Sequence, residues 1–292
     1  MSNTPLSRLA RSEAASGYAM ISPTAIYAIL MLAAPLITIV AYSFFKDGYL
    51  TILHEFTLDN YIATWSDPIF RAILLRSLIV SGLVTFVTVV LAFPIAYYIS
   101  FNVSASRKSL WIFLITIPFW TSYLIRVFLW KVILGYNGVI NSFLGALGLE
   151  DPLRMLNTVG AIAVTLAHAY APFAILPIFV SLEKIDRSLL EAGQDLGESR
   201  FMTFLRVTLP LAMPGVVAAV LIVFIPTIGD YVTPELIGGG KLPMVANMIQ
   251  AQMLPLDNKP MGSAIAVSAM VVVTVISVAF LFLNRKFLRG QK

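Results

Sequence analysis

The chain has 292 residues, of which 59% are hydrophobic and 12% are charged, and its mean hydropathy is +0.87. Because a soluble globular domain is about one quarter charged, these values exclude an ordinary soluble domain and indicate an integral membrane protein. The formal net charge of +5 requires no nucleic-acid partner, since membrane proteins retain Lys and Arg on their cytoplasmic side.

Six apolar runs are long enough to cross about 30 Å of hydrocarbon, which takes about 20 residues in a helix. The runs are continuous rather than alternating, so they predict an all-α fold of six transmembrane helices and not a closed β-barrel. The first run follows Arg8 and Arg11, but it is too long for a signal peptide and no small-residue cleavage pattern follows, so we expect a retained anchor. The predicted spans are residues 24–45, 77–100, 110–134, 158–182, 211–230 and 262–284.

The Lys and Arg residues between the spans predict the orientation, because cytoplasmic segments retain them. With both termini in the cytoplasm, twelve basic residues lie inside, six lie outside, and Arg126 and Lys131 fall within the third span. This orientation places residues 183–209 in the cytoplasm. The six outer residues are Lys46, Arg71, Arg76, Arg154, Lys241 and Lys259.

Three outer connections differ in kind, but none resembles a separate domain, so we expect one domain over residues 1–292. In the first connection, residues 57–61 are typical of a helix start capped by a short polar side chain. The third is predicted to form a short helix from about Pro243 to Leu254. The connections are residues 46–72, 135–157 and 231–261.

The cytoplasmic segment from residue 183 to residue 209 is too short and too polar to span the membrane. Apolar residues recur at helical spacing on one side, which predicts an amphipathic helix. Gly197 is expected to end this helix, and a second short apolar face begins at Phe201. Two short helices that project from the membrane suit insertion into a groove on a partner protein. The apolar side of the first helix comprises Ile185, Leu189, Ala192 and Leu196.

Within this segment the chain reads Glu191-Ala192-Gly193, three residues, Gly197, nine residues, Val207, one residue, and Leu209-Pro210. The spacing resembles the cytoplasmic signature of ABC-importer membrane subunits, in which Glu-Ala-Ala precedes a Gly and, later, Leu-Pro. Gly193, where that family usually has Ala, keeps the spacing but loosens the local helix. The resemblance implies a coupling helix that docks on a cytoplasmic ATPase. The implied coupling residues are Leu189, Glu191, Ala192, Gly193, Gly197, Leu209 and Pro210.

The alternative interpretation of residues 183–209 is a helix that lies on the lipid surface. Such helices usually carry a polar face rich in Lys and Arg, whereas this one is mostly acidic and would be repelled by anionic headgroups. Glu191 taken alone is equally an ordinary solvated charge, and only the match to the signature distinguishes it.

No catalytic site is predicted. The only Gly-Lys pair, Gly240-Lys241, is not a P-loop, because Glu235 and Leu242 stand where Gly and Ser or Thr are required. Two histidines and no cysteine suggest neither a metal centre nor a disulfide. We therefore expect this chain to bind no cofactor itself. The energy for its function would come from ATP and Mg on a partner ATPase or from an ion gradient.

A second segment, Ile117 to Arg126, reads Ile-Pro-Phe-Trp-Thr-Ser-Tyr-Leu-Ile-Arg. With Phe93-Pro94 and residues 190–214, it resembles the spermidine/putrescine permease subunits, and the similarity runs from about Asp59 to the sixth span. This resemblance implies a polyamine importer. Importers of other small organic solutes share parts of these segments, so another solute of that kind is the alternative.

Ionisable residues inside a membrane are costly and by default mark function. Asp230 lies at the outer end of the fifth span, where a carboxylate beside an aromatic ring suits an ammonium group of a polyamine. Pairing of Asp230 with Arg126 or Lys131 to close an outer gate is an equal alternative. The aromatic residues that precede Arg126 either line the pathway or pack between helices. The candidate pathway or gate residues are Trp120, Tyr123, Arg126, Asp230 and Tyr231.

These observations favour a permease subunit of a bacterial inner membrane, embedded in the bilayer and without a nucleic-acid partner. The resemblance implies a second permease subunit, two copies of a cytoplasmic ATPase and a periplasmic solute-binding protein. ATP would close the ATPase dimer and move the loop around Glu191, and the bundle would change from inward-facing to outward-facing. Pro118, Pro226 and Gly229 interrupt spans and are expected to let helices bend. An ion-coupled secondary transporter is the competing hypothesis, and the inverted repeats that would favour it are not detected.

Overall fold

The computed structural model describes residues 13–48, 51–149 and 151–289. Within these residues five helices are long and apolar enough to cross a membrane, and a bent helix pair brings the number to six if it forms one span. The all-α prediction is therefore confirmed. The five helices are α2 (Glu13–Ser43), α4 (Pro68–Asn102), α8 (Val159–Glu183), α11 (Leu209–Ile228) and α14 (Lys259–Leu283).

The third predicted span, residues 110–134, is a bent pair of helices and not one straight helix. Helix α5 (Ala105–Thr116) passes into the 3₁₀ turn η1 (Ile117–Trp120), and α6 (Tyr123–Ile133) leaves at 87° to α5. Pro118 has no backbone N–H to donate, and Thr121 is extended with ψ 148°, so the helical hydrogen bonds stop here. Pro118 thus causes the bend that was expected of it.

The other two residues expected to interrupt spans behave differently. Pro226 lies inside α11 without interrupting it, so that part of the prediction is wrong. Gly229 follows the last residue of α11 and ends the helix. The fifth span is therefore a single helix up to its outer end.

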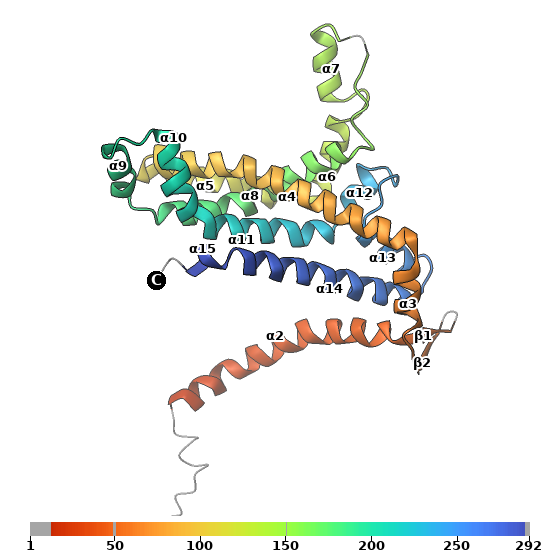
Figure 1. Cartoon of the computed structure of the whole chain (residues 1–292). Helices are drawn as coiled ribbons and strands as arrows, with labels where there is room; N and C mark the ends of the chain where they lie inside the picture. Colours follow the sequence, from red (N-terminus) through yellow and green to blue (C-terminus); the bar gives the residue numbers. More distant parts are fainter. Residues whose placement is uncertain (1–12, 49–50, 150, 290–292) are drawn as a thin grey trace, which may run out of the picture.

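Helices α4, α8 and α11 pack on one another and share the main apolar core (Figure 1). Small residues permit the close approach of α8 and α11. At Gly215 a side chain would collide with the backbone of Pro177, and the Gly215 N–H donates to Ser181 Oγ at 3.1 Å. A second apolar cluster joins α4 to α14, and α2 packs on α14 at the edge of the bundle.

The connections that were predicted to lie outside contain more structure than the sequence predicted. Helix α3 (Asp59–Ser66) begins where expected, but its N-cap residue is Leu58, whose side chain makes no capping hydrogen bond. Instead, Thr57 Oγ1 accepts from the Asp59 N–H at 3.1 Å. The helix expected from Pro243 to Leu254 is confirmed as α13 (Val245–Met253). Elements that were not predicted are the hairpin β1 (Phe45–Asp47) with β2 (Ile52–Phe56), α7 (Val139–Ala146), α12 (Val232–Leu236) and α15 (Arg285–Arg289).

Candidate functional site

Residues 183–209 fold into two short helices at one end of the bundle (Figure 1). Helix α9 (Arg187–Asp195) and helix α10 (Arg200–Thr203) are joined at Gly197, as the sequence predicted. A π-helical turn, η2 (Phe204–Thr208), then leads directly into α11. Because π-helical turns are rare and concentrate at functional sites, this junction is a natural place for motion to pass from the loop to the span.

Both ends of α9 are fixed by local hydrogen bonds. At its start, Asp186 Oδ1 accepts from the Ser188 N–H at 3.0 Å, and this bond lowers the pKa of the Asp186 carboxyl below its usual value. At its end, the Gly197 N–H donates to Gln194 O at 2.9 Å and the Glu198 N–H donates to Gly193 O at 3.1 Å. This pair of bonds is the Schellman motif, which needs a residue with positive φ, and Gly197 has φ 85°.

Gly193, the departure from the usual signature, lies at the contact between α9 and α10. A methyl group at this position would lie 3.2 Å from Thr203 Cγ2 and 3.4 Å from Thr203 Oγ1. Thr203 is buried. The missing side chain at Gly193 therefore lets α9 pack closely on α10, a tertiary role that was not expected from sequence.

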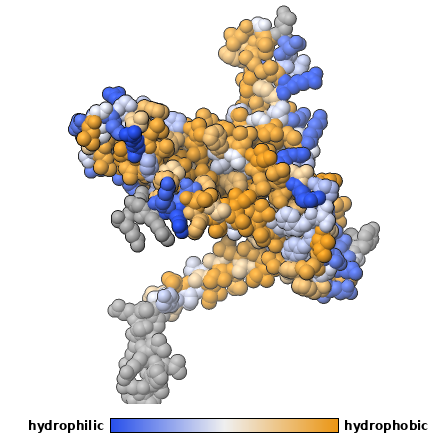
Figure 2. Space-filling model, in the orientation of Figure 1, coloured by the Kyte–Doolittle hydropathy of each residue, from blue (hydrophilic) through white to orange (hydrophobic). Residues whose placement is uncertain are grey.

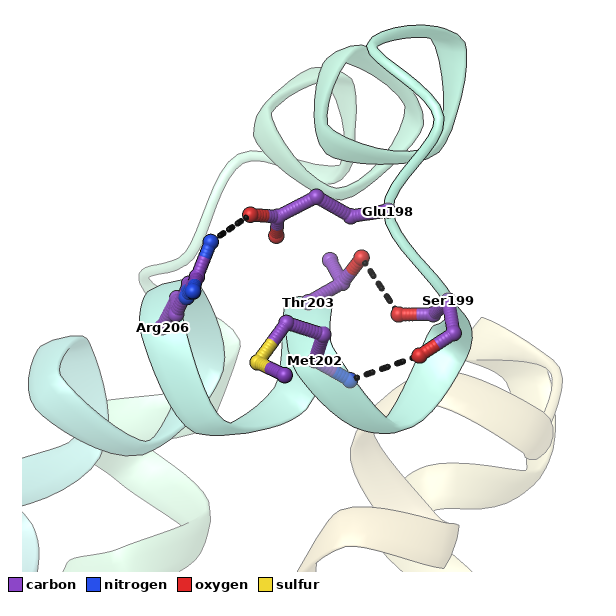
Figure 3. A network of polar contacts seen from close by, with 5 residues as sticks. All are labelled: Glu198, Ser199, Met202, Thr203 and Arg206. Atoms are coloured by element: carbon purple, nitrogen blue, oxygen red, sulfur yellow. Dashed lines mark hydrogen bonds and ion pairs between the residues drawn. The ribbon is translucent and has the colours of Figure 1, made fainter.

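Polar contacts hold α10 and η2 in one arrangement (Figure 3). Ser199 Oγ accepts from the Met202 N–H at 3.3 Å, and Ser199 O accepts from Thr203 Oγ1 at 3.2 Å. Arg206 Nη1 lies 2.7 Å from Glu198 Oε1. Since Arg206 is largely exposed, this ion pair contributes at most about 1 kcal/mol to the stability of the fold. Its main effect is to connect the segment around Gly197 to η2.

The exposed face of α9 carries apolar side chains outside the predicted membrane region. Leu189 is 48% exposed and Leu196 is 86% exposed, whereas Ile185 from the same predicted face is buried. Glu191 and Ala192 are exposed on α9, and Glu191 has no hydrogen-bonding or ion-pair partner among the described residues. Leu189, Glu191, Ala192 and Leu196 are hereafter the α9 surface. Large apolar groups left open beside a free carboxylate are typical of a protein-docking surface.

The remaining coupling candidates have a different place. Leu209 and Pro210 are the first two residues of α11 and are half-buried, with Pro210 in the first helical turn, where its missing N–H is tolerated. The helical run that could span the membrane is continuous from Arg200 to Ile228, so both residues lie inside it. The structure separates them from the α9 surface by α10 and η2.

Among the contacts that connect this loop to the bundle, three that join it to α4 were not predicted from the sequence. Arg187 Nη2 donates to Ser100 O near the end of α4 at 3.2 Å. Phe204 of η2 packs edge-on against Phe93 and Tyr97 of α4, with ring centroids 5.6 Å and 6.0 Å apart. Displacement of α9 or η2 therefore acts directly on α4.

A second cluster of candidates meets at the other end of the bundle, where α6 approaches α12. Tyr123 Oη donates to Asp230 Oδ2 at 2.8 Å and lies 2.7 Å from Thr233 Oγ1. Asp230 Oδ1 accepts from the Val232 N–H at 3.0 Å, at the start of α12. Asp230 is buried, and among the described residues neither Arg126 nor Lys131 forms an ion pair with it. The gate alternative that rested on such a pair is not supported in this conformation.

Arg126 is enclosed in the same region and is 8% exposed. Its Cζ lies 5.9 Å from the centroid of the Tyr123 ring, and its Nε and Nη1 have no hydrogen-bonding partner among the described residues. Tyr231 is half-exposed, and its carbonyl accepts from Asn247 Nδ2 at 2.9 Å. Trp120 is 80% exposed, so it does not pack between the described helices of this chain.

Comparison with known proteins places this geometry in a family. The family described as "Binding-protein-dependent transport system inner membrane component" matches residues 60–289. Two relatives bear the name "Spermidine/putrescine transport system permease protein PotB". The protein from Haemophilus influenzae is 36% identical over 258 residues, covering 86% of this chain and 90% of its own length. The protein from Escherichia coli is 35% identical over 246 residues, covering 84% of this chain and 89% of its own length.

The fold is also that of a solved transporter. A chain in the crystal structure of a bacterial alginate ABC transporter, in complex with a periplasmic protein that holds an alginate pentasaccharide, superposes with a TM-score of 0.74. The superposition covers 93% of this chain and 94% of that chain, at 19% sequence identity. At this identity the similarity shows the fold alone.

Proposed function

Because this chain belongs to the family of inner membrane components of binding-protein-dependent transport systems, we propose that it forms half of the translocation pathway of an ATP-driven importer for polyamines. The observation that carries the substrate class is its identity of 35–36% to spermidine/putrescine permeases over most of its length. Those relatives are transport subunits and not enzymes. Uptake of labelled spermidine and putrescine by cells that depend on this chain tests the proposal, with a neutral and an anionic solute as controls.

The α9 surface is the proposed contact with the cytoplasmic ATPase. Leu189 and Leu196 are exposed, although a large apolar side chain gains about 1.5–3 kcal/mol when it is fully buried. A groove on a partner would recover part of this free energy, and Glu191 beside the leucines supplies a charge that fixes orientation. Two ATPase copies, each using ATP and Mg, and a second permease subunit complete the proposed assembly.

The coupling is proposed to run through α10 and η2. ATP shifts the equilibrium only by binding the closed ATPase dimer more tightly than the open one. A moving α9 would carry α10 with it, because Gly193 packs on Thr203 and the pair of Arg206 and Glu198 ties the link to η2. From η2 the displacement would pass into α11 and, through Phe204, into α4.

The proposed contact for an ammonium group is Asp230 beside Tyr231. In the conformation described here Asp230 is 7% exposed and its Oδ2 accepts from Tyr123 Oη, so an ammonium group has little access to the carboxylate. Arg126 would oppose a cation, and because it is 8% exposed, solvent screens its charge little. We therefore assign the Asp230 contact to a different state of the transport cycle.

The proposed orientation has both termini and residues 183–209 in the cytoplasm, with residues 231–261 outside. A periplasmic binding protein would then deliver the polyamine to the end of the bundle formed by α12 and α13. If uptake of another small organic solute were found without competition by polyamines, the substrate class would fall while the permease class would stand.

A further inference from the structure

Two outer connections enclose a cavity that carries two cationic side chains. The cavity has a volume of about 490 Å³ and lies where the end of α6 meets the segments that follow α7 and α12. Arg154 and Lys241 line it together with Tyr136 and Asn157, and no described carboxylate lines it. In Figure 2 hydrophilic residues follow one edge of the arm that carries α7, while its other edge is hydrophobic. These features distinguish the cavity from the apolar grooves between the spans.

A buried asparagine holds one wall of the cavity in place. Asn141 of α7 is 5% exposed. Its Nδ2 donates to Gly135 O and Tyr136 O, both at 3.1 Å, and to Leu153 O at 3.0 Å. Its Oδ1 accepts from the Leu153 N–H at 2.9 Å. The residue before Arg154 is therefore fixed to α7 through two backbone contacts.

Contacts of Asn157 join the loop that carries Arg154 to the loop that carries Lys241 on the opposite wall of the cavity. Asn157 has φ 62° and donates its N–H to Ile237 O at 2.9 Å. Gly239 and Gly240 also have positive φ, and a side chain at Gly239 would collide with Asn157 Oδ1. Glycine adopts positive φ readily, whereas the conformation of Asn157 costs free energy and persists where the surroundings hold it. The two loops are thus locked together, which keeps Arg154 and Lys241 on one cavity.

The two cations have no side-chain partner among the residues that the structure describes. Arg154 and Lys241 are exposed, and among the described residues neither makes an ion pair or a side-chain hydrogen bond. Two like charges on one cavity repel each other and also repel a polycation that arrives nearby. A carboxylate in the cavity would weaken both repulsions.

We propose that this cavity receives acidic side chains of the solute-binding protein when that protein docks on the outer face. The inference rests on the proposed function, because it requires a soluble partner that delivers a cation. Charges at an interface rim accelerate association and select the orientation of docking. Docked carboxylates would also neutralise Arg154 and Lys241 at the moment when the polyamine is released.

The test uses the assembled importer in nanodiscs of neutral phosphatidylcholine and the polyamine-loaded binding protein of the same transport system. The double variant Arg154→Gln with Lys241→Gln should bind that protein about 2-fold to 30-fold more weakly, as expected for the loss of two solvated ion pairs. Its affinity should also depend less on NaCl concentration than that of the parent. The matched control removes two outer charges elsewhere, through Lys46→Gln and Lys259→Gln, and should bind like the parent.

Each other outcome overturns the proposal. Equal affinity and equal salt dependence in the double variant and the parent would remove the cavity from the interface. A loss that occurs only in nanodiscs containing an anionic phospholipid would show that the cavity holds a lipid headgroup. If the parent importer did not bind the solute-binding protein, both the proposed function and the docking site would be overturned. If the parent bound it normally and the double variant bound it equally well, only the docking site would be overturned.

Discussion

The two glycines of the proposed coupling loop, Gly193 and Gly197, are expected to respond differently to the same substitution. Gly197 has φ 85°, and a methyl group there would meet nothing within 4 Å. The cost of Gly197→Ala is therefore one of backbone conformation, about 1–2 kcal/mol for a non-glycine residue in the left-handed region. At Gly193 the same change gains about 1 kcal/mol of helix propensity. This gain is opposed by the contact at 3.2 Å with Thr203 Cγ2, so Gly193→Ala should be nearly neutral.

Hydrogen exchange at the amide of Glu198 reports on this difference, because that N–H closes the Schellman motif. Gly197→Ala should lower its protection by about 5-fold to 30-fold, the ratio that corresponds to 1–2 kcal/mol. Gly193→Ala should change it little, and adding Thr203→Ser, which deletes Cγ2, should raise protection above that of the parent. Equal loss of protection in both alanine variants would refute this account of the two glycines.

Three further predictions address the sites. Glu191→Ala should abolish polyamine uptake while the protein remains in the membrane, as measured by uptake and immunoblot; unchanged uptake would remove Glu191 from the ATPase contact. Asp230→Asn keeps an oxygen that accepts from Tyr123 but loses the charge, so spermidine uptake should fall with basal ATP hydrolysis retained, and normal uptake would exclude the proposed ammonium contact. In this cysteine-free chain, a cysteine at Ser199 should be labelled only from the cytoplasm and one at Leu256 only from outside; the opposite pattern would invert the topology.

The positions of the helices were largely predictable because the apolar runs are long and uninterrupted. The residues at which the helices begin and end were less predictable, although the sequence contains local signals for them. Helix α4 begins at Pro68, well before the predicted residue 77, and Asp67 caps it by accepting from the Ile69 N–H at 2.8 Å. An Asp-Pro pair of this kind marks a helix start. Pro118 also indicates the break between α5 and α6, but hydropathy averaged over a window of residues does not detect a single proline.

The candidate residues were identified by type and spacing, whereas their contacts depend on tertiary packing. No local pattern links Gly193 to Thr203, or Arg187 to the backbone of Ser100, since each pair joins separate elements. The carboxylate of Asp230 was expected to be available to a ligand. In the structure it accepts hydrogen bonds from the Val232 N–H at the start of α12 and from Tyr123 Oη. An aspartate two residues before Val232 is a local signal for a helix start.

ATP-driven spermidine uptake into proteoliposomes is the most direct test of the central claim. The vesicles would contain this chain with its second permease subunit and ATPase, and the loaded binding protein would be supplied at the outer face. The account predicts uptake that requires ATP, and it predicts that Leu189→Asp with Leu196→Asp on the exposed α9 surface abolishes ATPase binding and uptake together. Uptake that persists without the ATPase, or that is unaffected by these two substitutions, would contradict it.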